Sequence, residues 1–430
     1  MRILLINPPN CGRSIPEERY GITSLKQIFR GEPLSLETLA GNLPEHDVRI
    51  LDLKADPAGL EATLAAFVPD LVGLTAMTCE ANTVLALAGA IKKNAPATVV
   101  VGGVHASNDP DFFNHPDIDY IAIGLGKQSL REQISHLESG DQTPVPGIAR
   151  TNPGQKLRWQ PRSFSRADLA DSVAPRYDLV DHYRPQYTLE GLGLQMGLVA
   201  SAAGCPYDCN FCCIGPLTGG AYLTASIATV LRDIRALPQA PVIRLVDANS
   251  FGQPDHALAL AEAIAEVGLR KQYLADVRSD MVVRTPHLLK RWREVGLRAV
   301  VIGFEEIEDQ ALGNMNKANN QANNREAIRI LHDLGLTIVG DFIIAPDYTE
   351  DQFDRLGEFV REQQIELPMY TVLTPLPGTG LYERMKTEIS NHNLDYYTLT
   401  NAVVPTRLEE KLFYQRYAAL LQDGHHNAKV

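Results

Sequence analysis

Short apolar, strand-like segments alternate with helical segments along most of this chain, in two separate series. The strand-like segments of the first series lie at 2–7, 48–53, 71–76, 98–103 and 120–124. The segments between them place apolar residues at helical spacing. Because these strands are apolar on both faces, helices are expected to cover both sides of the sheet that they form. We therefore expect residues 1–145 to form a doubly wound, Rossmann-like α/β domain with a parallel sheet.

The second series begins at about residue 191 and predicts a barrel-like sheet. Its six strand-like segments lie at 191–201, 241–250, 272–277, 297–305, 336–345 and 368–380. Successive strand and helix units of one kind are typical of βα barrels. We expect a partial (βα)6 TIM-barrel domain over residues 191–385 and a short helical tail over 386–430. The stretch between the two series, 146–190, is rich in proline, arginine and tyrosine and lacks periodicity, which predicts a long, partly ordered linker.

Composition and charge narrow the possible partners and compartments. The 430 residues carry a formal net charge of −12 and show no basic stripe, so nucleic acid is not expected as a partner. No apolar run approaches the roughly 20 residues that a membrane-spanning helix needs. The apolar run in MRILLINPPN, at the N-terminus, is too short for a signal peptide. We therefore expect a cytoplasmic protein.

Four of the six cysteines lie within ten residues, in the segment GCPYDCNFCC at 204–213. A disulfide, a zinc site and an iron–sulfur cluster are the three candidate explanations. A reducing cytoplasm disfavours the disulfide, and structural zinc wants four ligands, commonly from two pairs, of which no second pair occurs here. Three thiolates at the spacing of Cys205, Cys209 and Cys212 can bind three irons of a 4Fe–4S cluster and leave the fourth iron open. The spacing favours the cluster over zinc, and we expect the adjacent Cys213 to pack in the interior.

With Phe211 as the aromatic residue, these cysteines form the pattern C-x3-C-x-aromatic-C, on a loop expected after the first strand of the barrel. This pattern resembles the signature of the radical S-adenosylmethionine (SAM) superfamily. Together with the α/β domain in front of it, the chain resembles the cobalamin-binding subgroup over essentially its whole length. The resemblance implies that Cys205, Cys209 and Cys212 hold the catalytic 4Fe–4S cluster. It also implies that SAM binds the open iron, with Phe211 close by.

Three further segments resemble SAM-binding motifs of the superfamily. LVDANSF resembles F-x-D-D-x-F, which implies that Asp247 lies beside the SAM amino group, although Ala248 replaces the second acid. ADVRSD implies that Arg278 lies near the SAM ribose and carboxylate, and the fork of an arginine suits a carboxylate. GFEE places Glu305 at the acid position of the family's G-I-E-S segment. The alternatives are structural carboxylates or helix caps for the two acids, and a surface ion pair for the arginine.

In the first domain, LTAMT (74–78) and GGVHAS (102–107) resemble the loops that receive the nucleotide tail and the corrin edge of cobalamin. Glycines at strand ends permit close backbone approach, and threonine hydroxyls can bind amides and phosphate. The resemblance implies that the cobalamin-binding residues are Thr75, Thr78, Gly102, Gly103, His105, Gly124 and Gly126. The D-x-H-x-x-G sequence that supplies a histidine to cobalt is absent, and His105 is expected to be a structural or corrin-edge residue. The alternative is a domain of the same fold that holds no cofactor.

The resemblance implies a cobalamin-dependent radical SAM methyltransferase. The reduced cluster would cleave SAM to methionine and a 5′-deoxyadenosyl radical, which would abstract a hydrogen from a small-molecule substrate. Methylcobalamin would then methylate an unactivated carbon or phosphorus of that substrate. A flavodoxin or ferredoxin is the expected electron donor. The alternatives are a radical SAM cyclase or rearrangement enzyme without net methylation, and a non-catalytic cobalamin or iron–sulfur protein.

Overall fold

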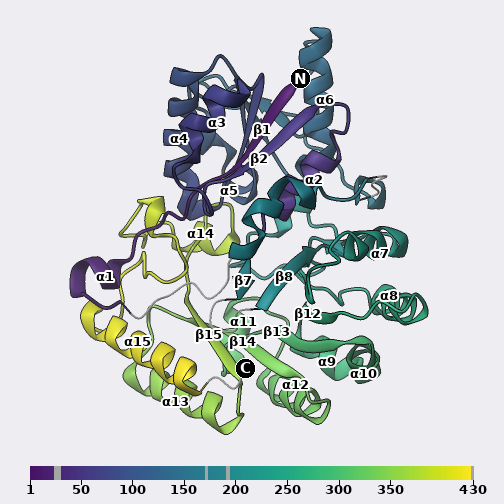
Figure 1. The fold of residues 1–430 in the computed structure, drawn as a ribbon. Helices are drawn as coiled ribbons and strands as arrows, with labels where there is room; N and C mark the ends of the chain where they lie inside the picture. The colour runs from purple at the N-terminus through teal and green to yellow at the C-terminus, as the bar shows by residue number, and fades with distance from the viewer. Residues whose placement is uncertain (24–30, 170–172, 190–193, 428–430) are drawn as a thin grey trace.

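The structure is a computed structural model that describes residues 1–23, 31–169, 173–189 and 194–427. Two sheets, each accompanied by helices, follow one another along the chain, and the C-terminal segment packs beside both (Figure 1). Among the described residues, no helix combines the length and the apolar character that crossing a membrane requires.

Within the described residues, the first sheet has the strand order β2-β1-β3-β4-β5-β6. Its strands are β1 (Arg2–Asn7), β2 (Asp47–Asp52), β3 (Leu71–Thr75), β4 (Thr98–Gly102), β5 (Tyr120–Ala122) and β6 (Ile148–Arg150). The pairs from β2 to β5 are parallel, whereas β5 and β6 pair antiparallel. The parallel sheet expected for the first series is confirmed.

Helices cover both faces of this sheet. They are α2 (Leu34–Gly41), α3 (Gly59–Phe67), α4 (Ala81–Asn94), α5 (Val104–Asn108) and α6 (Gly126–Ser139). The β1 residues Leu4 and Ile6 pack with α3 and α4, whereas Ile3 and Leu5 pack with α2 and α6. This division follows from the two-residue period of side chains along a strand. The sheet is therefore doubly wound, as its apolar strands predict.

The second sheet has the order β15-β14-β13-β12-β11-β8-β7 within the described residues. Its strands are β7 (Thr188–Leu189), β8 (Leu194–Val199), β11 (Val242–Leu245), β12 (Gln272–Val277), β13 (Leu297–Glu305), β14 (Thr337–Ile344) and β15 (Leu367–Val372). Neighbouring pairs from β8 to β15 are parallel, and β7 is an antiparallel edge strand. The sheet curls into a half barrel (Figure 1). This confirms the six strands and the partial barrel expected from the second series.

The outer face of the half barrel carries its main core. The helices on this side are α7 (Ile227–Arg235), α8 (Pro254–Glu266), α10 (Pro286–Val295), α12 (Gln321–Asp333) and α13 (Glu350–Glu362). In this core the ring of Phe342 stacks on those of Phe304 and Tyr370, with centroid distances of 5.5 and 5.9 Å. The short helices α9 (Ser279–Arg284) and α11 (Asp309–Asn314) follow the C-terminal ends of β12 and β13.

The described residues of the stretch 146–190 contain, besides β6 and β7, the 3-10 helices η3 (Arg166–Leu169) and η4 (Tyr177–Gln186). Tyr187 donates a hydrogen bond to Asp52 of the first domain over 2.9 Å. The hydroxyl of Tyr177, the first residue of η4, donates a hydrogen bond to the backbone carbonyl of Leu198 in β8, also over 2.9 Å. The stretch is therefore bonded to both domains.

The C-terminal tail contains the helix α15 (Glu410–Asn427), which confirms the expected helical character. It packs beside β15 and α13, and Tyr417 donates a hydrogen bond to the carbonyl of Tyr370 over 2.8 Å (Figure 1). Before α15, the side chain of Asn401 accepts a hydrogen bond from the backbone of Ile15, the first residue of α1 (Ile15–Tyr20), over 2.7 Å. The tail thus joins the last strand of the half barrel to the first domain.

Candidate active site

The cysteine loop, residues 204–213, follows β8 and the short strand β9 (Ala202–Ala203) at the C-terminal edge of the half barrel. It turns at Gly204, where φ is +78° and a Cβ would lie 2.0 Å from the carbonyl oxygen of Ala221. The backbone of Asn210 fixes the centre of the loop. Its N–H donates to the carbonyl of Met315 over 3.1 Å, and its carbonyl accepts from the N–H of Leu381 over 2.8 Å. Glycine is therefore required where the loop begins, and neighbouring loops hold its middle.

The cysteines of this loop are free thiols. Burial raises the pKa of Cys205, and it raises the pKa of Cys212 to about 11, which in the absence of iron favours the thiol proton. Iron binds the thiolate and must displace that proton. Among the described residues, no three Cys, His, Asp or Glu side chains converge on a point that could hold a single metal ion. A cubane cluster needs no such convergence, because its thiolates bind separate irons, and the donor set of three thiols suits it.

Asp247 follows β11 and is 3% exposed. Its carboxylate accepts hydrogen bonds from the backbone N–H and the hydroxyl of Ser201, over 2.7 and 2.6 Å, and from the backbone N–H of Ala202 over 2.7 Å. Burial raises the pKa of Asp247, and these hydrogen bonds oppose that rise. The structure thus brings Asp247 to the base of the cysteine loop, where it holds the chain as it leaves β8. Its contact with SAM stays a prediction.

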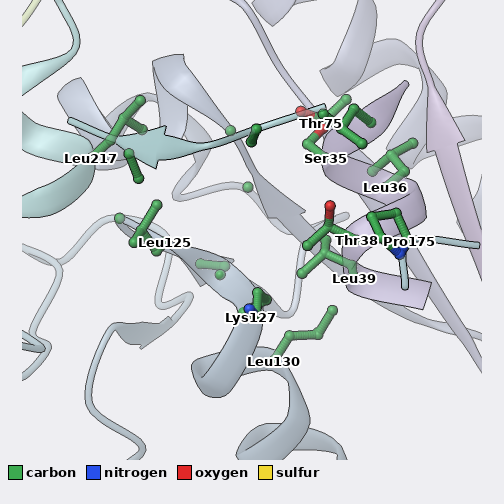
Figure 2. A pocket seen from close by; sticks show the side chains of 18 of the residues that line it. Ser35, Leu36, Thr38, Leu39, Thr75, Leu125, Lys127, Leu130, Pro175 and Leu217 are labelled. Carbon is green, nitrogen blue, oxygen red and sulfur yellow. The ribbon is translucent and has the colours of Figure 1, made fainter. Parts of the chain in front are cut away.

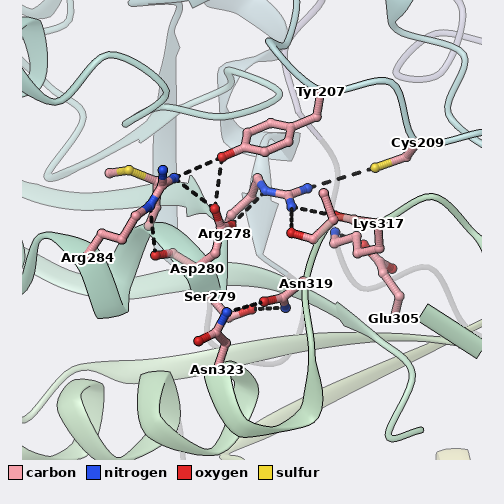
Figure 3. Close-up of polar contacts among 12 residues, drawn as sticks. Tyr207, Cys209, Arg278, Ser279, Asp280, Arg284, Glu305, Lys317, Asn319 and Asn323 are labelled. Atoms are coloured by element: carbon pink, nitrogen blue, oxygen red, sulfur yellow. Dashed lines mark hydrogen bonds and ion pairs between the residues drawn. The ribbon is translucent and has the colours of Figure 1, made fainter. Parts of the chain in front are cut away.

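Arg278 follows β12 and lies against the cysteine loop (Figure 3). Its Nη1 is 3.8 Å from the Sγ of Cys209, and its guanidinium carbon lies 3.6 Å from the ring centroid of Tyr207. Its Nε donates to Asp280 over 2.9 Å, and its Nη2 donates to the backbone carbonyl of Lys317 over 2.5 Å. Sequence reasoning identified Arg278 but missed Tyr207 and Asp280, whose only signal was their position inside the cysteine and ADVRSD segments.

Glu305 is the last residue of β13 and has a φ of +63°, at a shift in the register between β13 and β14. Its carboxylate forms a buried ion pair with the Nζ of Lys317. Lys317 has no counterpart in the sequence predictions, because it lies in an asparagine-rich run that follows no recognisable pattern.

The carboxyl of the neighbouring Glu306 accepts a hydrogen bond from Tyr348, and burial raises the pKa of Glu306 to about 7. Phe211 is partly exposed on the cysteine loop.

A cavity of about 470 Å³ lies between the first domain and the half barrel (Figure 2). The first domain lines it with α2, the C-terminal ends of β3, β4 and β5, and the start of α6. The half barrel contributes β9, residues beside it, and part of α7. Five of the predicted cobalamin residues line the cavity, namely Thr75, Gly102, Gly103, Gly124 and Gly126. Thr78 and His105 are not among its lining residues.

Apolar side chains dominate the first-domain side of the cavity; those in view include Leu36, Leu39 and Leu130 (Figure 2). At Gly103 φ is +98°, and a Cβ would lie 2.7 Å from the hydroxyl of Thr75. At Gly124 φ is +84°, and a Cβ would lie 2.7 Å from the ring of Phe164. Larger residues at these positions would push the lining loops apart. The volume is within the range of ligand pockets, and its place at the C-terminal edge of a doubly wound sheet suits a nucleotide tail with an apolar base. The residues present therefore fit cobalamin.

His105 lies beside this cavity but is fully buried. Its ring packs edge-on against Phe112 and Phe113, at centroid distances of 5.1 and 5.5 Å. Within the described part of the chain, neither ring nitrogen has a hydrogen-bond partner. Burial lowers the pKa of His105 to about 4, so the imidazole is neutral at pH 7.

Comparison with known protein families assigns a domain to each sheet. The B12 binding domain family matches residues 26–133, and the Radical SAM superfamily matches residues 199–360. The first match covers most of the doubly wound sheet, and the second covers the cysteine loop and the strands from β11 to β14.

Individual proteins match over most of the chain. The hopanoid C-3 methylase of Methylococcus capsulatus is 30% identical over 403 residues, which are 90% of this chain and 75% of that protein. The anaerobic magnesium-protoporphyrin IX monomethyl ester cyclase of Synechocystis is 26% identical over 92% of this chain and 80% of its own. The structure of the radical SAM methyltransferase TsrM from Kitasatospora setae, with cobalamin and a 4Fe–4S cluster bound, superposes with a TM-score of 0.71 at 18% identity. The superposition covers 91% of this chain and 75% of TsrM. The two proteins therefore share a fold.

Proposed function

Because this chain belongs to the family of radical SAM proteins that carry an N-terminal B12-binding domain, we propose that it is a cobalamin-dependent radical SAM methyltransferase. Its substrate would be a small molecule, methylated at an unactivated carbon or at phosphorus. The relative that is 30% identical over 90% of this chain is named a hopanoid C-3 methylase, which supports methylation of carbon.

One observation carries this proposal. The cavity between the two domains extends to Ala203, which lies two residues before Cys205 in the sequence. A group held in the cavity would therefore lie next to the cysteine loop. Methyl transfer requires that the methyl donor and the activated substrate meet in one space that excludes water. The boundary between the two domains offers such a space.

When bound, the cluster supplies the electron that splits SAM, and cobalamin supplies the methyl group. Cys205, Cys209 and Cys212 would hold the cluster through their thiolates. Asp247 orients the backbone that enters the loop, because its carboxylate accepts three hydrogen bonds there. Glu305 and Phe211 are the proposed neighbours of SAM. The glycines at the strand ends of the first domain would let the backbone approach the cobalamin tail.

A second candidate function is cyclisation or rearrangement without net methylation. It is favoured by the cyclase relative, which matches 92% of this chain. For either function we propose that a flavodoxin or a ferredoxin delivers the electron.

The test is anaerobic purification, reconstitution with iron and sulfide, and loading with cobalamin, followed by incubation with SAM and dithionite. We expect corrinoid absorption bands, four irons per chain, and the formation of 5′-deoxyadenosine. With candidate substrates, a methylated product together with S-adenosylhomocysteine supports methyl transfer, whereas an unmethylated cyclic or rearranged product supports the second candidate.

Two cysteine variants make this test specific. Cys209→Ala is expected to lower the cleavage of SAM at least a hundredfold, because the cluster loses one of its three protein ligands. Cys213→Ala is the matched control, since Cys213 is a partly exposed neighbour outside the three-cysteine spacing. Full SAM cleavage by Cys209→Ala, or binding of both cofactors without any SAM cleavage by the wild type, would contradict the proposed function.

A further inference from the structure

Arg278 is the group around which the polar contacts beside the cysteine loop are organised (Figure 3). Tyr207, whose ring stacks on the guanidinium, donates its hydroxyl proton to Asp280 over 2.9 Å. Arg284 donates to the same carboxylate over 2.8 Å and to the Tyr207 hydroxyl over 3.0 Å. The plane of the Arg278 guanidinium is therefore held from its face by Tyr207 and from its Nε edge by Asp280.

The fork of Arg278 is already occupied by protein acceptors. An arginine binds a carboxylate through two parallel N–H groups, either those of Nη1 and Nη2 or those of Nε and Nη2. Both arrangements therefore need Nη2. In Arg278, Nη2 donates to the backbone carbonyls of Lys317 and Ala318, over 2.5 and 3.5 Å. Nη1 is directed at the Sγ of Cys209 at 3.8 Å, within hydrogen-bonding range of a sulfur acceptor. Arg278 is thus placed to serve a sulfur atom rather than a bidentate carboxylate.

The loop that supplies these two carbonyls is strained. Asn316 and Ala318, on either side of Lys317, have φ values of +52° and +51°, although neither is glycine. The loop is held in this shape from two sides. Asn316 donates a hydrogen bond to the Asp208 side chain over 2.9 Å, and Lys317 forms its ion pair with Glu305. Such strained conformations persist only where the surroundings impose them, and they concentrate at functional sites. Here the strain aims two carbonyls at one arginine.

We propose that Arg278 is a positioning residue that donates a charged hydrogen bond to the Cys209 sulfur and so raises the reduction potential of the bound cluster, and that it does not bind the SAM carboxylate. This inference rests on the proposed function, because it requires that Cys209 is a cluster ligand. Reduction adds negative charge to the cluster, and a positive charge with an N–H directed at a ligand sulfur stabilises the reduced form. The fixed guanidinium would make the cluster easier to reduce before SAM is cleaved.

The experiment measures two quantities on the same reconstituted proteins. The first is the midpoint potential of the cluster without SAM, from an EPR-monitored redox titration, and the second is the Kd of SAM. For Arg278→Gln we expect the equilibrium constant for reduction to fall about tenfold, which corresponds to a potential lower by about 59 mV for one electron. We expect the Kd of SAM to change less than threefold. An unchanged potential together with a Kd raised tenfold or more would overturn the inference.

Two further variants keep the result interpretable. Arg284→Gln is the matched control, because Arg284 donates to Asp280 and Tyr207, as Arg278 contacts both, but within the described residues it makes no hydrogen bond to the cysteines; the potential of this variant should equal that of the wild type. Arg278→Lys preserves the charge but not the guanidinium geometry, so its potential should lie below that of the wild type. This comparison can be made even if Arg278→Gln holds no cluster. A potential equal to that of the wild type in Arg278→Lys, with a weakened Kd of SAM, would also contradict the inference. If the wild type itself assembles no 4Fe–4S cluster, the proposed function fails; if only the potentials are unaffected, this inference alone fails.

Discussion

At the scale of single residues, Gly204 controls how the chain enters the cysteine loop. Its φ of +78° belongs to the left-handed region, and the space where a side chain would begin is filled by the carbonyl oxygen of Ala221 and the side chain of Thr218. A glycine is needed for two independent reasons, backbone conformation and space. The next residue is Cys205, so any displacement here moves a proposed cluster ligand.

Gly204→Ala should therefore lower both stability and cluster binding. We expect the free energy of unfolding to fall by about 1–3 kcal/mol, and the iron bound per chain after reconstitution to fall by at least half. Urea unfolding and iron analysis measure the two effects. Gly220→Ala is the matched control, since Gly220 has a similar φ of +82° but open space around its Cβ position. An equal loss of iron in both variants would show that strain alone, and not the contact with Ala221, is responsible.

At the scale of elements, η4 connects the two sheets through a buried ion pair. Arg184 in η4 donates to a carboxylate oxygen of Glu32 over 2.8 Å, and the other oxygen accepts from the backbone N–H of Leu198 over 2.6 Å. The two side chains are 7% and 0% exposed. One buried carboxylate thus joins the start of α2, the helix η4 and the strand β8. The helix η4 therefore has a structural role despite the irregular composition around it.

Arg184→Met should destabilise the chain strongly, because it leaves Glu32 buried without a countercharge. The expected loss in the free energy of unfolding is about 3–5 kcal/mol, measured by urea titration of the cofactor-free chain. Arg176→Met removes the pair with Asp178, in which both side chains are exposed, and should cost about 1 kcal/mol or less. Similar losses in the two variants would mean that the buried pair does not hold the domains together.

At the scale of the whole molecule, the cavity between the domains is the feature that neither domain supplies alone. Ala122, at the end of β5, is buried and lines it from the first domain, whereas Ala202 and Ala203 line it from the half barrel. Small residues on both sides leave the volume open. Uptake of a cofactor at this place therefore depends on how the two domains pack.

Ala122→Phe should fill part of the cavity and lower the cobalamin bound per chain at least tenfold, while the iron content stays near that of the wild type. Absorption spectroscopy and iron analysis on the same sample measure both. Ala66→Phe, at an exposed position of α3, introduces the same side chain away from the cavity and should leave both contents unchanged. Normal cobalamin uptake by Ala122→Phe would exclude this cavity as the binding site.

The sequence by itself determined the two parallel sheets, their order along the chain and the three-cysteine loop, because strand periodicity and ligand spacing are local properties. The edge strands β6 and β7 escaped prediction, since three and two residues are too short to show a period. Only the tertiary structure decided the partners of the named residues: Arg278 meets Cys209 across 69 positions of sequence, and Asp247 meets Ser201 across 46. Such contacts depend on how the strand ends converge, and no local pattern encodes that convergence.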